Sequence, residues 1–285
     1  MNSVPSVRNL SEVSMFKFFL KKNFCDGWDN FFFLIVSNII MIALLVGSFL
    51  AVRYSAEINP YLPNLAIVLV SGIVMTALFA WGANAAKLAD FCSGSFGLFF
   101  SAVKSVWKIG FAFGVTVSAS LLIARYAISY YIQLYLSSGS YVGLVLTALL
   151  GWFVLISMIA LQWFIPLYFL QGNNGFKKCL KKSFIIFYDN VAFSVEVFIY
   201  NIVLFGLSCV FFMLMPGLCG ILLSSTNALR LRLYKYDWIE KMVEKDPDFE
   251  KDRDRRNEVP WDELIADDKE SLGPRNWKSF VFPWK

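Results

Sequence analysis

Long apolar stretches dominate this chain and leave few folds open to it. Five stretches are mostly apolar, near residues 30–52, 64–86, 109–136, 141–170 and 191–234. A helix needs about 20 such residues to cross the hydrocarbon core of a bilayer. The last stretch is too long for one helix and contains Met215-Pro216-Gly217. Proline breaks a helix and glycine permits a turn, so we expect this stretch to form two helices.

Division at this turn gives helices at 191–214 and 217–234, and therefore six spans arranged as three hairpins. We predict an all-α fold, a polytopic helical membrane protein whose transmembrane domain covers residues 1–236. The span at 217–234 is the least apolar of the six, because serine, asparagine and arginine residues crowd its second half.

The basic residues predict the orientation of the spans. With six spans and the N-terminus inside, the cytoplasmic segments carry 14 lysine and arginine residues, whereas the short outer connections carry only Arg53. Cytoplasmic loops of membrane proteins carry such an excess of positive charge. We therefore expect a bacterial-type protein of the cytoplasmic (inner) membrane with both termini in the cytoplasm and membrane lipid as its surroundings.

Composition argues against an enzyme and against a nucleic-acid-binding protein. The chain has no histidine, which removes the Ser-His-Asp and Cys-His arrangements and the commonest metal ligand. Its five cysteines show no CxxC spacing. The basic residues stand at the ends of apolar runs, so the net charge of +5 does not indicate nucleic acid. We expect no catalytic residues, no metal site and no cofactor.

The sequence also contains an internal repeat. Residues 16–33 and 176–193 share nine identical positions at a constant offset of 160. Each copy reads as a basic amphipathic helix, an Asp-Asn pair and then a span, which predicts amphipathic helices on the cytoplasmic face. Asp29 and Asp189 are expected to be N-caps of the spans that follow. A weaker copy begins near Phe96.

Small residues at four-residue spacing mark two of the predicted spans. One stripe consists of Gly72, Thr76, Ala80 and Asn84, and the other consists of Gly110, Gly114 and Ser118. Small residues let the backbones of membrane helices approach closely. These stripes therefore predict where two spans touch.

Polar residues within the spans are the candidates for a substrate path. Glu196 is ionisable, and Asn84, Asn201 and Asn227 carry amides in largely apolar surroundings. Such groups inside a membrane are functional candidates by default. The alternative for Glu196 is a polar cluster on the cytoplasmic side, and for the asparagines it is hydrogen bonding between helices.

Residues 237–285 differ from the rest of the chain and form a cytoplasmic tail. Its first part is dense in charges of both signs, and its last part combines aromatic residues with two Pro-Trp pairs. Disordered tails are poor in aromatic residues, whereas binding hot spots are rich in tryptophan. We expect a docking segment for a protein partner, which would make the chain a subunit of a larger membrane complex. Its anchors are Trp261, Trp277, Phe280, Phe282 and Trp284. The alternative is that the tail folds back on the chain's own cytoplasmic helices.

Several short runs resemble the YesL-type bacterial membrane proteins. These runs are residues 163–167 and 176–184, the Pro216-Gly217 turn and residues 227–230. The resemblance covers roughly residues 14–236 and implies a small helical inner-membrane protein, often encoded beside carbohydrate-uptake genes. That family has no agreed catalytic or binding residues to carry over, and the long tail departs from its pattern.

Together these features favour an accessory or permease-like component of small-solute transport. The alternative is a membrane scaffold or assembly subunit that recruits a partner through its tail. An enzyme that acts on lipid with only Asp, Glu or Lys is the third and weakest hypothesis.

Overall fold

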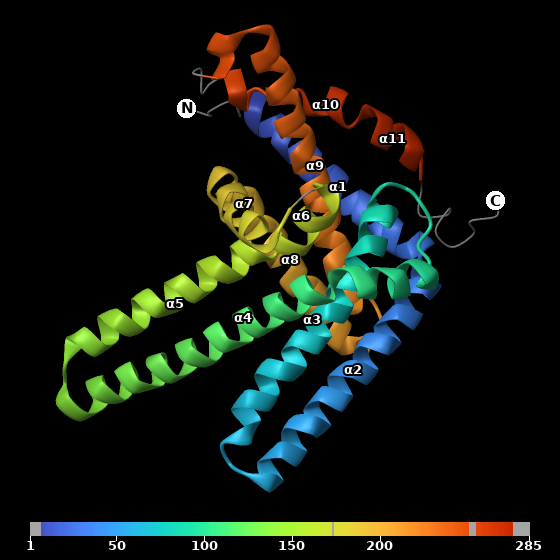
Figure 1. The fold of residues 1–285 in the computed structure, drawn as a ribbon. Helices are drawn as coiled ribbons and strands as arrows, with labels where there is room; N and C mark the ends of the chain where they lie inside the picture. Colours follow the sequence, from blue (N-terminus) through green and yellow to red (C-terminus); the bar gives the residue numbers. More distant parts are fainter. Residues whose placement is uncertain (1–6, 173, 251–254, 276–285) are drawn as a thin grey trace.

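The computed structural model of the protein describes residues 7–172, 174–250 and 255–275 (Figure 1). Every regular element in these ranges is helical. The α-helices are α1 (Val7–Asp29), α2 (Phe31–Ile58), α3 (Leu62–Ala89), α4 (Phe96–Ser138), α5 (Tyr141–Leu161), α6 (Phe164–Leu170), α7 (Phe176–Asp189), α8 (Val191–Val210), α9 (Gly217–Lys245), α10 (Trp261–Leu264) and α11 (Ala266–Leu272). Two short 3₁₀ helices, Pro247–Glu250 and Arg255–Asn257, lie between α9 and α10.

Five helical segments in the described ranges are long and apolar enough to cross a membrane. They are α2, α3, α4, the stretch Tyr141–Leu170 that contains α5 and α6, and α8. These segments coincide with the first five predicted spans, and the prediction of an all-helical membrane fold is confirmed. The structure divides the predicted span at 141–170 into two helices, since α5 ends at Leu161 and α6 begins at Phe164.

The sixth predicted span, 217–234, forms the first part of α9 and is not among these five segments. The helix is surrounded by its own chain, because α1, α2, α3, α6 and α8 all pack against it. Its polar residues Ser224, Ser225, Thr226 and Asn227 are buried. A helix inside a bundle needs protein partners for such groups rather than an apolar surface towards lipid, which explains its low hydropathy.

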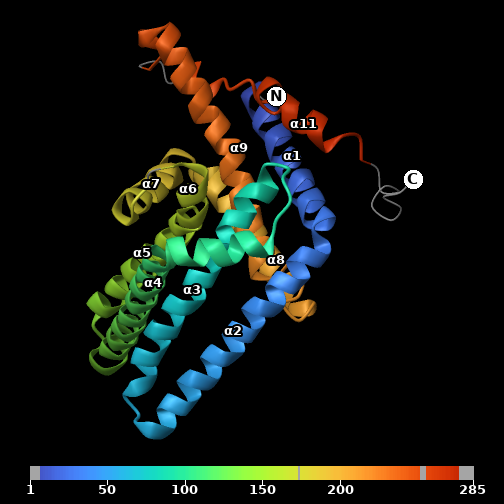
Figure 2. The same ribbon diagram turned by 45° about the vertical axis from the view of Figure 1, so that its right-hand side comes forward.

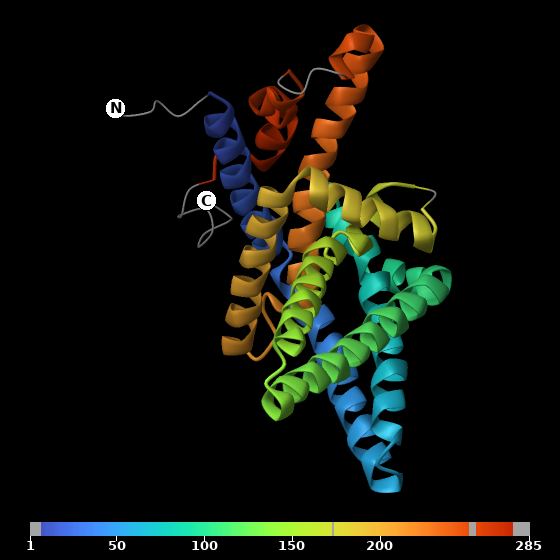
Figure 3. The same cartoon turned by 90° about the vertical axis from the view of Figure 1, so that its left-hand side faces the viewer.

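The two longest hairpins extend away from the rest of the molecule. Figure 1 shows α2 paired with α3 and α4 paired with α5, and the two hairpins point in different directions. Figures 2 and 3 show from two further sides that both hairpin tips lie at the end of the molecule opposite α10 and α11. This arrangement is the one that the three-hairpin topology predicts for the connections near 53–63 and 137–140.

The predicted stripes of small residues mark the contact between α3 and α4, the most extensive helix pair among the described residues. A Cβ atom added to Gly110 would lie 2.8 Å from the Cα atom of Thr76, and one added to Gly114 would lie 2.8 Å from the Cα atom of Gly72. Only glycine permits this approach of the two backbones. The prediction of where these helices touch is confirmed.

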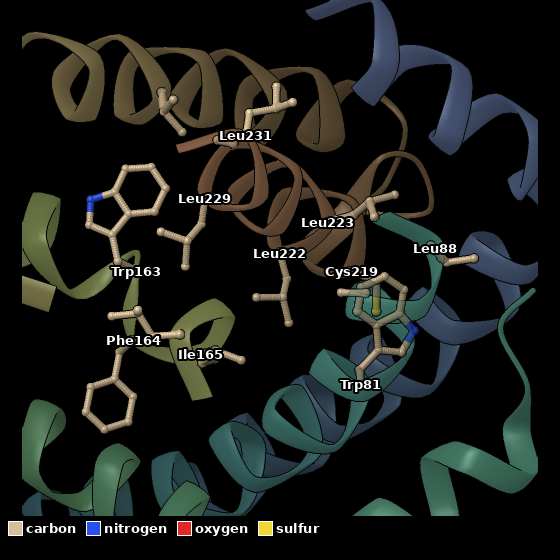
Figure 4. Close-up of a cluster of buried hydrophobic side chains, with 14 of the residues drawn as sticks. Trp81, Leu88, Trp163, Phe164, Ile165, Cys219, Leu222, Leu223, Leu229 and Leu231 are labelled. Atoms are coloured by element: carbon tan, nitrogen blue, oxygen red, sulfur yellow. The ribbon is translucent and has the colours of Figure 1, made fainter. Parts of the chain in front are cut away.

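Large side chains from several helices fill the interior around α9. Figure 4 shows Trp163, Phe164 and Ile165 from the α5–α6 region and Trp81 from α3 around the leucines of α9. Trp163 and Phe164 are completely buried. Buried aromatic side chains remove large apolar areas from the surroundings, so this cluster contributes much of the packing that fixes α9.

The predicted break at Met215-Pro216-Gly217 is confirmed, because α8 ends at Val210 and α9 begins at Gly217. Asn38 of α2 holds this turn. Its Nδ2 donates to the carbonyl oxygens of Leu214 (2.9 Å) and Pro216 (2.7 Å), and its Oδ1 accepts from the backbone N–H of Cys219 (3.0 Å). A side chain 176 residues earlier therefore satisfies the backbone groups that the turn leaves unpaired.

Two local expectations are wrong. Asp29 and Asp189 do not cap the helices that follow, because each is the last residue of the preceding helix, α1 or α7. Asp29 instead pairs with Arg275 at 2.7 Å, and Asp189 accepts a hydrogen bond from the hydroxyl of Tyr236 at 2.6 Å. The interfacial helix expected near Phe96 is not separate either, since it continues into the span as the 43-residue helix α4.

Candidate functional site

A buried ion pair lies on α1, near its end. The Nζ atom of Lys22 is 2.9 Å from Oδ2 of Asp26, and the two residues are 0% and 5% exposed. Residues four apart lie on one face of a helix, so α1 presents both charges to the same side. The ring of Phe91, from the loop between α3 and α4, covers the ammonium group at 3.6 Å from the ring centre.

Amide side chains extend this pair to two further helices. Asn227 of α9 donates to Oδ2 of Asp26 at 2.9 Å and to Oδ1 of Asn23 at 3.2 Å. Asn23 in turn donates to the hydroxyl of Tyr200 on α8 at 3.1 Å. We call these five residues (Lys22, Asn23, Asp26, Tyr200 and Asn227) the polar cluster. It joins α1, α8 and α9, which are distant in the sequence.

Burial disfavours the charged forms of both residues of the ion pair. It lowers the pKa of Lys22 and raises the pKa of Asp26 from their ordinary values, because the charged forms lose their hydration. The opposite charge of each partner offsets part of this shift. The charged forms of both groups are therefore disfavoured by burial and favoured by each other.

Arg230 of α9 lies beside the polar cluster, against the loop after α3 and α11. It donates to the carbonyl oxygen of Ala89 at 2.8 Å, and it forms ion pairs with Asp90 at 3.0 Å and with Asp268 at 2.9 Å. Its guanidinium also lies 5.7 Å from the ring centre of Phe91. One side chain thus connects α9 to the loop after α3 and to α11 of the tail.

The described part of the tail packs on its own chain. Trp261 is 1% exposed and α10 contacts α1, while the guanidinium of Arg232 lies 5.4 Å from the tryptophan ring. This packing corresponds to the alternative in which the tail folds back on the chain's own helices, and the docking role of Trp261 stays a prediction. The other predicted anchors, Trp277, Phe280, Phe282 and Trp284, lie outside the described residues.

The residues of the predicted substrate path fall in different surroundings. Asn227 belongs to the polar cluster, whereas Asn201 donates to Ser225 at 3.0 Å and Gln162 at 3.4 Å. The Oδ1 atom of Asn84 accepts from the backbone N–H of Ser95 at 2.8 Å, beside the start of α4. These bonds are the interhelical and helix-to-loop contacts of the structural alternative.

Glu196 is apart from these residues. It lies on an exposed flank of α8, while Phe193, Ser194 and Val197 of the same helix are buried. The structure does not include it in the polar cluster, so its role in a substrate path stays a prediction.

Sequence reasoning missed Lys22 and Asp26 as a pair, because lysines in this region were counted only as cytoplasmic flanks of a span. The sequence did contain a signal for this pair. Met15, Phe19, Lys22 and Asp26 lie on one helical face, so two charged residues lie on the face that an amphipathic helix buries. Oppositely charged residues at this spacing indicate an ion pair.

Comparison of the chain with protein-family models, with characterised proteins and with solved structures finds no match. Within the described residues, no group of three or more cysteine and acidic side chains could hold a metal ion. The described residues of the site form a buried ion pair with amide and phenol partners.

Proposed function

We propose that the protein is a multi-pass protein of a bacterial inner membrane that works as a permease-like or accessory component of small-solute transport. The buried pair of Lys22 and Asp26 is the observation that supports this proposal. A buried ion pair adds little stability compared with apolar residues of the same size. Ionisable groups among the helices of membrane proteins commonly belong to ion and proton pathways.

The position of the polar cluster suggests how proton binding could affect the packing of the helices. Asp26 and Lys22 lie where α1, α8 and α9 meet, and Asn227 contacts Asp26 directly at 2.9 Å. A change in the protonation of Asp26 would weaken its attraction to Lys22 and change the hydrogen bond from α9. Proton binding would thereby alter the contact between the amphipathic helix α1 and the interior helix α9.

Uptake measurements test the proposal. The resemblance to YesL-type proteins suggests a panel of labelled mono- and disaccharides, measured in cells that carry the full chain, a deletion, or Asp26→Asn. We expect the deletion and Asp26→Asn to lower uptake of the same sugar, whereas Asp262→Asn in an exposed ion pair should not. Uptake that is unchanged by the deletion across the panel would reject a transport role, and Glu196→Ala would show whether that residue contributes.

A scaffold that recruits a protein partner is the second candidate. The observation in its favour is the aromatic density of residues 259–285, in which two Pro-Trp pairs stand beside further aromatic residues. Crosslinking in native membranes tests it with the full chain and with a variant that lacks residues 276–285 and so retains Trp261. The scaffold hypothesis expects a specific membrane protein to be lost from the shortened variant. Identical crosslinked partners would count against the tail as a recruiting segment.

A further inference from the structure

Helix α7 presents one face to the bundle and the opposite face outwards. Cys179, Ser183 and Ile186 on the inner face are buried. The outer face carries two lysines followed by two large side chains, and all four are exposed. These residues are Lys177, Lys181, Ile185 and Tyr188, which we call the α7 face. Positions four, eight and eleven residues after the first lie on the same side of a helix, so the four side chains form one surface.

The two lysines of the α7 face are not used in the packing of the bundle. Lys182, the next residue in the sequence, donates to Oε1 of Gln171 at 2.7 Å and so holds α7 to the chain before it. The ammonium groups of Lys177 and Lys181 make no ion pair or hydrogen bond with any residue that the structure describes. Four lysines and one aspartate give the helix a net charge of +3. The α7 face is therefore a positively charged surface that lacks a counter-charge among the described residues.

Helix α7 lies at the level where the headgroups of a bilayer begin. Phe187 packs with Ile159 and Ala160, which belong to the last turn of α5. From Tyr141, at the hairpin tip, α5 rises roughly 28 Å to this level, which is close to the hydrocarbon thickness of about 30 Å. Figure 3 shows α7 (yellow) lying across the direction of α8, the span that follows it. A helix in this position lies along the membrane surface.

The chemistry of the α7 face matches an anionic phospholipid. A lysine ammonium group is a compact cation that binds phosphate oxygens, and its stem lies along apolar surface while the charge reaches the headgroups. Ile185 and Tyr188 extend the same face with apolar area, and tyrosine is enriched at the boundary between membrane and water. Amphipathic helices with this composition bind at the interface of membranes that contain anionic lipids.

We propose that the α7 face binds the headgroups of anionic phospholipids. Lys177 and Lys181 contact the phosphates, and Ile185 and Tyr188 contact the acyl chains below them. A zwitterionic headgroup also carries a cation, so its attraction to the two lysines is weaker. The site does not depend on the proposed transport function, since it shares no residue with the polar cluster.

The first copy of the internal repeat supplies a matched control. Lys17 and Lys21 of α1 stand at the positions of the repeat that correspond to the two lysines of the α7 face, and they are exposed as well. Figures 2 and 3 show that α1 extends away from the spans, on the side opposite the hairpin tips, rather than across them. The same residues in α1 therefore carry equal charge in a different position relative to the membrane surface.

Photocrosslinking tests the proposal on the full chain. The protein is reconstituted in phosphatidylcholine vesicles that contain a trace of phosphatidylglycerol or phosphatidylcholine, each with a diazirine at the glycerol end of one acyl chain. Adducts are located by mass spectrometry of peptides, and the ratio of phosphatidylglycerol to phosphatidylcholine labelling is calculated for each segment. The segment around Trp152, a lipid-facing residue that is 64% exposed, reports general contact with lipid. One lysine near an anionic headgroup increases binding about fivefold, so we expect the ratio on residues 176–189 to exceed the Trp152 ratio at least fivefold.

Three double variants make the test specific. Lys177→Gln/Lys181→Gln should lower the ratio on residues 176–189 to the Trp152 level, whereas Lys177→Arg/Lys181→Arg keeps both charges and should retain the higher ratio. Lys17→Gln/Lys21→Gln removes the same net charge from the protein and should leave the ratio on residues 176–189 unchanged.

Three results would overturn the proposal. The first is a ratio on residues 176–189 that equals the Trp152 ratio in the unaltered protein, which would indicate that the α7 face contacts water or a protein. The second is a ratio that the glutamine variant of α7 leaves unchanged. The third is an equal decrease in the glutamine variant of α1, which would indicate attraction by the overall charge of the protein.

Discussion

The ion pair between Lys22 and Asp26 allows a quantitative prediction for the variant Asp26→Ala. Lys22 is completely buried, so its ammonium group cannot turn to solvent once the carboxylate is gone. Removal of one partner of a buried pair costs about 3–5 kcal/mol of stability. The loss has an upper limit, because an unpaired Lys22 can release its proton and become neutral. For a lysine with the ordinary pKa of 10.5, release of the proton at pH 7 costs about 5 kcal/mol. We therefore expect a loss of about 3–5 kcal/mol at pH 7.

The double variant Lys22→Met/Asp26→Ala should regain most of that stability. It leaves no unpaired charge in the interior, and an apolar replacement of a buried pair is often neutral. The remaining loss, about 1–2 kcal/mol, reflects the contact between Lys22 and Phe91 and the small cavity at residue 26.

The pH dependence has a definite sign. Burial depresses the pKa of Lys22, so the folded state binds this proton less tightly than the unfolded state does. The free energy of unfolding is therefore highest above the ordinary pKa of lysine, and it decreases as the pH falls through the folded-state pKa of Lys22. In Asp26→Ala the depression is greater, because the carboxylate that raises this pKa is absent. The loss of stability should therefore shrink as the pH rises from 7 towards 10.

The free energy of unfolding is measured by titration of the purified protein from mild detergent into sodium dodecyl sulfate. Asp262→Ala is the matched control. The pair Lys269–Asp262 has a similar distance, 2.8 Å, but its side chains are 42% and 74% exposed. Exposed pairs contribute about 0–1 kcal/mol. If Asp26→Ala is no worse than this control, or if its loss grows with pH, the reasoning from burial is wrong.

Three further predictions concern packing, the α8–α9 turn and orientation. Gly114→Leu should destabilise the protein by about 1–3 kcal/mol, because the new side chain meets the backbone of α3. Gly151→Leu, on the open surface of α5, is the control and should leave the stability unchanged. Thermal unfolding in detergent measures both variants. Asn38→Ala should lower the unfolding temperature, because each buried backbone group that loses its partner costs about 1–3 kcal/mol, and an unchanged temperature would contradict this. In inside-out vesicles an impermeant maleimide should modify the exposed Cys92 but not Cys179, which is buried and whose pKa burial raises to about 11. Modification of Cys92 only in right-side-out cells would reverse the predicted topology.

Features that depend on neighbours along the chain were predictable. The apolar stretches, the break at Met215-Pro216-Gly217 and the small residues Gly110 and Gly114 all lead to local consequences that the structure confirms. The errors arose where a residue had to be assigned to the end of one helix or the start of the next. Asp29 is the example, because the last turn of α1 and a capping position before α2 differ by a single residue.

The candidate site was predictable only in part. Asn227 was selected as a polar residue in an apolar span, yet its partners Asn23 and Asp26 lie 204 and 201 residues earlier in the chain. Helical periodicity could place Lys22 and Asp26 on one face of α1. It could not indicate that α9 and the Phe91 loop cover that face.

Hydropathy and charge by themselves determined that this chain forms several lipid-compatible helices, because the length of an apolar run and its flanking residues are local properties of the sequence. The tertiary structure alone decided that the first part of α9 lies inside the bundle, that Lys22 and Asp26 are buried as a pair and that Trp261 packs on its own chain. The physical reason is that burial of a polar group depends on which helices surround it. That choice is made by packing between segments far apart in the sequence.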